Sequence, residues 1–421
     1  MESKLVRAYS HPLKWLHPWF SAYALAGMMV SGLVPVMLPI TAQPAGHAAV
    51  GFVVASFFVG QLTAPYNRAV ADRLGKQRVM FLAAFPVMAV CAVVLGVSDS
   101  VYIWILAALL AGAAAGTAQT LGSVFIVEGH PKEQWNTLLG WFRLTFGLGQ
   151  VVGLAIGGLF ASSNLRLGWI IAALIMMLGV FLGRIGLPHL QTAPGHSATA
   201  DSTVDVTSKQ HKTLKIRIQG FLTVLKSRFG FLLVCWFLSS ISVLMFLNAM
   251  PLVMSDAFEI GSSLSASVYL VGALAGAVAY PAVGDLSRRV GAGRVALFGF
   301  LLSFAALTCM AIAFFAHPSW GVAVGLVGMF CVAFSYPYQY IGANLLAATL
   351  ASGSEGGAMG MFNASAASGA VIGALAPVGL ASAFGYGSYL PLAAGIGLLG
   401  IVVGIPVLLG KHHRGPWKTT A

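Results

Sequence analysis

Long apolar runs, separated by short polar segments, follow one another along almost the whole chain. Each run is long enough to form the helix of about 20 residues that crosses a bilayer. Lipid offers the backbone no hydrogen-bond partners, so a crossing segment of this kind must be helical. The pattern predicts an all-α polytopic membrane protein with transmembrane helices at about 17–40, 49–67, 79–97, 101–127, 136–161, 166–187, 229–254, 263–283, 295–316, 319–346, 357–384 and 388–410.

The composition agrees with a membrane protein and excludes an ordinary soluble one. Hydrophobic residues make up 58% of the chain and charged residues only 8%, whereas soluble domains carry about 25% charged residues. The net charge of +12 could suggest nucleic-acid binding. If the N-terminus is cytoplasmic and the spans alternate, however, every Lys and Arg except Arg143 and Arg166 falls on the cytoplasmic side. This is the positive-inside rule, so we expect cytoplasmic termini, no nucleic-acid partner and a bacterial inner-membrane location.

The spans divide into two halves that repeat one plan. A Ser-, Thr- and His-rich stretch at 188–228 separates six spans in 1–187 from six in 229–421, which ends in a short cytoplasmic tail. The segment at 68–78 matches the segment at 284–294, and Gln119 matches Gln339 with a similar separation. We therefore predict two pseudo-symmetric six-helix bundles joined by a cytoplasmic linker. Repeats of this kind are typical of transporters that bind substrate between the halves.

The loop between the second and third spans concentrates charge in the sequence "RAVADRLGKQR". The pattern predicts that one helix ends at Asp72, that Gly75 allows a tight turn, and that the next helix begins at Arg73–Arg78. Asp72 would pair with a basic residue or lie near a helix N-terminus. The alternative is that the basic residues only set the topology.

This loop resembles the signature loop of the major facilitator superfamily, Gly-x-x-x-Asp-Arg-x-Gly-Arg-Lys/Arg. Asp72, Arg73, Gly75 and Lys76 match it, while Arg68 stands at the position of the leading glycine. The second copy, "GDLSRRVGAGR", keeps Arg289 and Gly291. The resemblance covers essentially the whole chain and implies a cytoplasmic gate formed by these six matching residues.

Glycines recur every four residues in the fifth span, "GWFRLTFGLGQVVGLAIGG". They form one smooth stripe on which another helix can pack closely. The spacing also resembles the superfamily's antiporter motif, Gly-x8-Gly-x3-Gly-Pro-x2-Gly-Gly, with Leu154 in place of the proline. The resemblance implies proton-coupled efflux, and the alternative is helix packing alone. The matching positions are Gly140, Gly149, Gly153, Gly157 and Gly158.

A proton relay normally needs a titratable group inside the membrane. No Asp, Glu or His lies in the middle of any predicted span. Protons as the coupling ion are therefore implied by the resemblance and not by an intramembrane carboxylate.

Arg143 is the one charged residue well inside a predicted span, so it is a candidate for the substrate cavity. Gln150 lies on the same helix face as Arg143, and Asn363 is the counterpart of Arg143 in the second half. Two alternatives stay open for Arg143. It could extend its side chain to the cytoplasmic surface, or it could pair with Glu128 in a structural or gating bridge.

Further polar candidates come in symmetric or clustered positions. Gln119 and Gln339 form a symmetric pair that would line the cavity or, alternatively, hold helices together. Tyr336, Tyr338 and Tyr340 flank Pro337 in "SYPYQYIGAN". Tyr336 is a candidate for the cavity wall, and an interfacial aromatic belt is the alternative.

We therefore predict a secondary transporter that exports a small organic molecule by alternating access. The first alternative is uptake of a small organic anion through Arg143. A non-transporting receptor or an intramembrane enzyme is the alternative from another class, and the paired polar positions disfavour it. The sequence shows no nucleotide-binding motif and no cluster of metal ligands or nucleophiles, so we expect no enzyme activity and no cofactor. The expected partners are the substrate, protons and the bilayer, and we expect a monomer.

Overall fold

A computed structural model describes residues 17–129, 132–187, 227–317, 319–350 and 355–410. Twelve helical segments in these ranges are long and apolar enough to cross a membrane, and the described residues contain no strand. The predicted all-α, twelve-span fold is confirmed. Most of the predicted linker at 188–228 and the tail after 410 lie outside the described residues.

The first half contains six spans, and its first two are interrupted. A π-helix, η2, lies within the first span and a 3₁₀ turn, η3, ends it. In order, the elements are α2 (Phe20–Gly27), η2 (Met28–Leu33), α3 (Val34–Ala42), η3 (Gln43–Ala45), α4 (His47–Gln61), α5 (Ala64–Leu74), α6 (Gln77–Val97), α7 (Val101–Gly129), α8 (Lys132–Phe160) and α9 (Leu165–Arg184).

The second half follows the same plan, with breaks near the C-terminal ends of its first and fifth spans. Its elements are α11 (Arg228–Leu247), α12 (Met250–Phe258), α13 (Ser262–Val290), α14 (Ala292–Ala316), α15 (Gly321–Leu350), α16 (Glu355–Leu375), α17 (Val378–Phe384), η4 (Tyr386–Ser388) and α18 (Tyr389–Leu408). α12 begins with Pro251 in its first turn, where the missing N–H of proline costs no hydrogen bond.

The second span corrects one helix boundary. The prediction ended a helix at Asp72 and began the next at Arg73, but α5 continues through both residues to Leu74. Gly75 then adopts the left-handed conformation with φ of 62°, in which glycine ends a helix at little cost because it has no Cβ. The predicted turn at Gly75 is confirmed, and Arg73 belongs to the last turn of the preceding helix.

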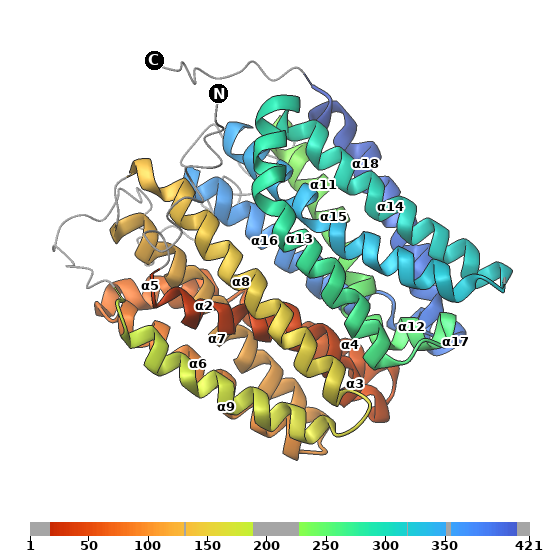
Figure 1. The fold of residues 1–421 in the computed structure, drawn as a ribbon, viewed down its shortest axis with the longest axis horizontal. Helices are drawn as coiled ribbons and strands as arrows, with labels where there is room; N and C mark the ends of the chain where they lie inside the picture. The colour runs from red at the N-terminus through yellow and green to blue at the C-terminus, as the bar shows by residue number, and fades with distance from the viewer. Residues whose placement is uncertain (1–16, 130–131, 188–226, 318, 351–354, 411–421) are drawn as a thin grey trace, which may run out of the picture.

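The two halves lie side by side, with α8 of the first half packed along α13 of the second and α4 packed against α16 (Figure 1). At the end opposite to the Gly75 and Gly291 turns, the halves touch through small and aromatic residues. The His47 and Tyr386 ring centroids are 4.7 Å apart, and the hydroxyl oxygens of Ser162 and Ser263 are 2.7 Å apart. Ser263 also donates a hydrogen bond to the Gly158 carbonyl. The two halves are therefore in contact at this end of the interface.

Stacked aromatic residues repeat between the halves. Phe142 in α8 stacks on Tyr23 with a centroid distance of 3.5 Å and an interplanar angle of 8°. Phe362, which is 220 residues later in α16, stacks on Trp236 at 4.7 Å and 8°. The same position of the repeat therefore carries the same packing role in both bundles.

Candidate substrate site

Arg143 of α8 lies where the two halves meet, near the start of the span at Trp141–Phe160. Its guanidinium carbon is 5.5 Å from the centroid of the Tyr340 ring in α15, which is within the range of a cation–π interaction. Tyr336 stacks on Tyr340, with centroids 5.8 Å apart and an interplanar angle of 22°. Tyr23 and Tyr280 are close enough to interact electrostatically with Arg143. One cation from the first half thus faces tyrosines from both halves.

The positive charge of Arg143 has no described counter-ion. No carboxylate among the described side chains lies within 4.0 Å of it, and the Glu128 side chain lies outside the described ones. Placing a charged side chain in the membrane interior costs a few kcal/mol of free energy. A cation–π contact stabilises the charge by about 0.5 to 2 kcal/mol, so it offsets only part of that cost. An anion at this position would therefore be stabilised by the unbalanced charge.

Two buried polar groups beside this cluster also lack a partner. The Tyr23 hydroxyl and the Trp236 indole N–H are buried and form no hydrogen bond with another described residue. A buried hydrogen-bond donor normally has an acceptor, which can be a protein group, a bound water or a bound ligand. Tyr23, Tyr280 and Trp236 were not predicted from the sequence. Polar groups within apolar spans were the available signal, but nothing in the sequence showed that they meet Arg143.

The predicted amides have different environments. Gln150 donates a hydrogen bond from Nε2 to the Tyr269 hydroxyl, at 3.3 Å across the two halves. Gln339 is buried and donates to the Gly299 carbonyl at 3.2 Å and to the Ser335 hydroxyl at 2.8 Å. Gln339 thus holds α15 to α14, which is the alternative that the sequence left open. Gln119 is half-buried and Asn363 is exposed, and the side chains of both form no hydrogen bond with a described residue.

The glycine stripe of α8 allows very close packing on the first span. An ideal Cβ built at Gly149 would lie 2.9 Å from the Cα atom of Ala24, and one built at Gly153 would lie 2.8 Å from the Cα atom of Gly32. A Cβ at Gly157 would contact Val36, also in the first span, at 3.1 Å. Packing therefore explains these three positions within the first half.

The last glycine of the motif faces the other half. A Cβ at Gly158 would be 3.2 Å from the Cβ of Ala266 in α13. The surroundings of Gly140 lie outside what the structure describes. Three glycines of the motif thus pack inside the first bundle, and Gly158 packs against the second bundle.

The charged loop forms ion pairs within each copy. Asp72 pairs with Arg68 at 3.5 Å and accepts a hydrogen bond from Gln77 at 2.6 Å. In the second copy Arg289 pairs with Asp285 at 3.1 Å. Exposed pairs of this kind contribute about 0 to 1 kcal/mol each, so their effect on overall stability is small.

The other predicted gate residues lie in or beside the turns of the two loops. Arg73 and Lys76 are exposed, and Gly291 has a φ of 106° between α13 and α14. Arg68, which replaces the leading glycine of the signature, supplies the partner of Asp72.

Twelve described helices that are long and apolar enough to cross a membrane, in two bundles that meet at the Arg143–Tyr340 contact, indicate a polytopic membrane protein. The profile of the Major Facilitator Superfamily matches residues 19–357. The chain belongs to this superfamily.

Similarity to known proteins establishes the fold more firmly than the activity. Two crystal structures of the nucleoside transporter NupG, one of them a D323A mutant, superpose with TM-scores of 0.69 and 0.71 at 12% identity. They cover 94% and 93% of this chain and 98% of NupG. The multidrug export protein EmrB of Haemophilus influenzae is 27% identical over 120 residues, which is 28% of this chain. The match spans only 23% of the length of EmrB.

Proposed function

We propose that this transporter carries small aromatic organic anions by alternating access, with Arg143 as the counter-charge. The observation that carries the proposal is the Arg143–Tyr340 contact between the halves. A guanidinium forms two parallel hydrogen bonds with a carboxylate, sulfonate or phosphate, and the surrounding tyrosines offer ring faces for an aromatic substrate. Arg143 and Tyr340 belong to different halves. The contacts of a substrate bound to both would therefore change when the halves move relative to each other.

We further propose export coupled to proton influx as the direction of transport. The glycine spacing of α8 and the partial similarity to a multidrug export protein support this direction. Uptake of the same anions is the second candidate. It is favoured by the lack of Asp, Glu and His in the middle of the spans, because such groups normally relay the proton of an antiporter.

Transport into membrane vesicles distinguishes the two directions. The probe is benzenesulfonate, which stays charged and crosses lipid poorly. Inverted vesicles with an acidic lumen should accumulate it, because export from the cytoplasm becomes movement into the lumen in exchange for protons. A protonophore should abolish the accumulation. Vesicles with Arg143→Gln protein at equal amount are the control.

Two other outcomes decide against parts of the proposal. Accumulation confined to right-side-out vesicles would mean uptake and overturn the direction alone. Equal transport of benzenesulfonate and benzylamine, which carries a positive charge, would overturn the anion selectivity.

A cross-link at the closed outer contact tests alternating access. In the Ser162→Cys/Ser263→Cys double variant, the thiols would replace hydroxyls that are 2.7 Å apart. Mild oxidation should form a disulfide and stop transport, because the outer ends could no longer separate. Reduction should restore the transport rate, and each single cysteine variant should be insensitive to oxidation. Unchanged transport by the cross-linked protein would contradict the mechanism.

A further inference from the structure

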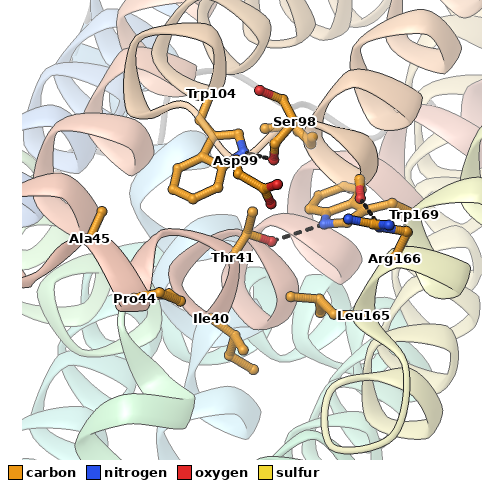
Figure 2. Close-up of a pocket in the computed structure, with 12 residues that line it drawn as sticks. Ile40, Thr41, Pro44, Ala45, Ser98, Asp99, Trp104, Leu165, Arg166 and Trp169 are labelled. Atoms are coloured by element: carbon orange, nitrogen blue, oxygen red, sulfur yellow. Dashed lines mark hydrogen bonds between the residues drawn. The ribbon is translucent and has the colours of Figure 1, made fainter.

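A cavity of about 340 Å³ opens at the outer ends of α3, α6, α7 and α9. All of its lining residues belong to the first half (Figure 2). Its size is close to the lower end of the range for small-molecule sites. The proposed function does not use this cavity.

Two tryptophans form apolar walls of the cavity, and their N–H groups are already bonded. The Trp104 indole donates to the Ser98 carbonyl at 2.8 Å, and the Trp169 indole donates to the Thr41 hydroxyl at 2.9 Å. Both rings are buried and line the cavity. Trp104 is 6% exposed and Trp169 0%, so of the two only Trp104 offers ring surface to a ligand, and other groups must supply the polar contacts of that ligand.

Asp99 and Arg166 supply opposite charges to the same cavity. Arg166 donates from Nε to the Gly96 carbonyl at 3.1 Å, which leaves its two terminal nitrogens without a described partner. The Asp99 carboxylate forms no hydrogen bond or ion pair with a described residue, so the two charges do not neutralise each other. Figure 2 shows the Asp99 carboxylate above Thr41, with Trp104 on one side and Arg166 on the other.

The presence of Arg166 is unexpected from topology. It is the only Lys or Arg that the predicted topology places in an outer loop, whereas basic residues on the cytoplasmic side set the orientation of the chain. Arg166 is therefore not needed for topology. Its position at the start of α9 places it at the membrane boundary, where lipid phosphates lie.

The helices below the cavity offer a surface for acyl chains. α6 and α9 pack against each other, and both expose large apolar side chains, with Val90 62% and Leu174 66% exposed. Apolar side chains on the outside of a membrane helix contact lipid. A ligand with a zwitterionic head and a hydrocarbon tail would thus find both of its parts accommodated.

We propose that this outer cavity binds a zwitterion with an ammonium and a phosphate group, supplied by the phosphatidylethanolamine headgroup of the outer leaflet. Arg166 binds the phosphate, since a guanidinium matches two phosphate oxygens. Asp99 accepts hydrogen bonds from the ammonium, and the Trp104 ring packs beside it. Phosphatidylcholine has the same phosphate but no ammonium N–H, so Asp99 distinguishes the two lipids.

Native mass spectrometry of the purified full-length protein, with defined lipids added in detergent, tests this site. Wild-type protein should retain phosphatidylethanolamine about tenfold better than phosphatidylcholine, the ratio given by one charge-assisted hydrogen bond. Asp99→Asn should remove that preference, and Arg166→Gln should weaken the binding of both lipids. Glu259→Gln and Arg184→Gln, which neutralise exposed charges away from the cavity, should retain lipid as the wild type does.

The folded state of each variant is checked by thermal stability in detergent without added lipid. Asp99→Asn removes no described hydrogen bond, so it tests the proposal even if Arg166→Gln fails to fold. Equal retention of both lipids by the wild type, or an unchanged preference in Asp99→Asn, would overturn the proposal. Free phosphoethanolamine should compete only weakly, and binding of this soluble compound as tight as that of the lipid would overturn the membrane source.

Discussion

Replacement of Arg143 by glutamine is expected to reduce transport of benzenesulfonate about 100-fold. The guanidinium lies between the two halves beside Tyr340, without a described carboxylate within 4.0 Å. Loss of one partner from a desolvated charge pair costs about 3 kcal/mol, which corresponds to about 100-fold in affinity. Initial rates of benzenesulfonate accumulation in vesicles, at matched protein amounts, measure this effect.

Two controls separate substrate binding from folding or gating. Neutral benzenesulfonamide, which has the same ring, should be transported no more slowly by Arg143→Gln than by the wild type. The variant should unfold at the same or a higher temperature, because it removes a buried charge that has no described counter-ion. If Arg143 instead paired with Glu128, Glu128→Gln would reduce transport as strongly as Arg143→Gln. That outcome would contradict a substrate-binding role.

Replacement of Gly149 by alanine is expected to destabilise the protein by about 1 to 3 kcal/mol, the usual cost of overpacking. The added Cβ would meet the backbone of Ala24, including the Cα atom at 2.9 Å. Backbone atoms of a helix cannot rotate away as the end of a flexible side chain can. α8 would have to move from the first span, and Gly149→Leu should move it further. The unfolding temperature in detergent measures the loss.

Gly147, two residues earlier on the same helix, is the matched control. A Cβ there meets only the Cβ of Ala277, at an ordinary 3.5 Å. Gly147→Ala should leave stability unchanged or raise it by up to about 1 kcal/mol, because alanine favours a helix more than glycine. Equal unfolding temperatures for Gly147→Ala and Gly149→Ala would show that the close contact does not govern packing.

Much of the fold could be predicted from the sequence, because lipid imposes one solution on a long apolar run. The twelve runs, the alternation of charge and the turn at Gly75 are all consequences of local chemistry. The break of the first span at η2 could not be predicted in the same way. Gly32 within η2 faces Gly153 of α8, so the π-helix coincides with a contact between residues far apart in the sequence.

The candidate site was predicted only in part. Arg143 could be identified because a charge inside a span is costly, and Tyr336 lay in a conspicuous tyrosine cluster. The gathering of Tyr23 and Tyr280 around Arg143 depends on how α2 and α13 pack, which no local pattern contains. Conversely, Gln339 matches Gln119 in the repeat, but the two side chains have different roles. Gln339 donates a hydrogen bond to the carbonyl of the small Gly299 in the neighbouring helix α14.

Equilibrium binding of benzenesulfonate and benzenesulfonamide to the purified wild-type protein tests the central claim most directly. The two probes share one ring and differ in charge, so the ratio of their Kd values isolates what the interior cation contributes. If Arg143 is the counter-charge, benzenesulfonate binds about 100-fold more tightly, and the ratio falls to near one in Arg143→Gln. Equal affinities of the wild type for the two probes would contradict the assignment of Arg143 as the anion site.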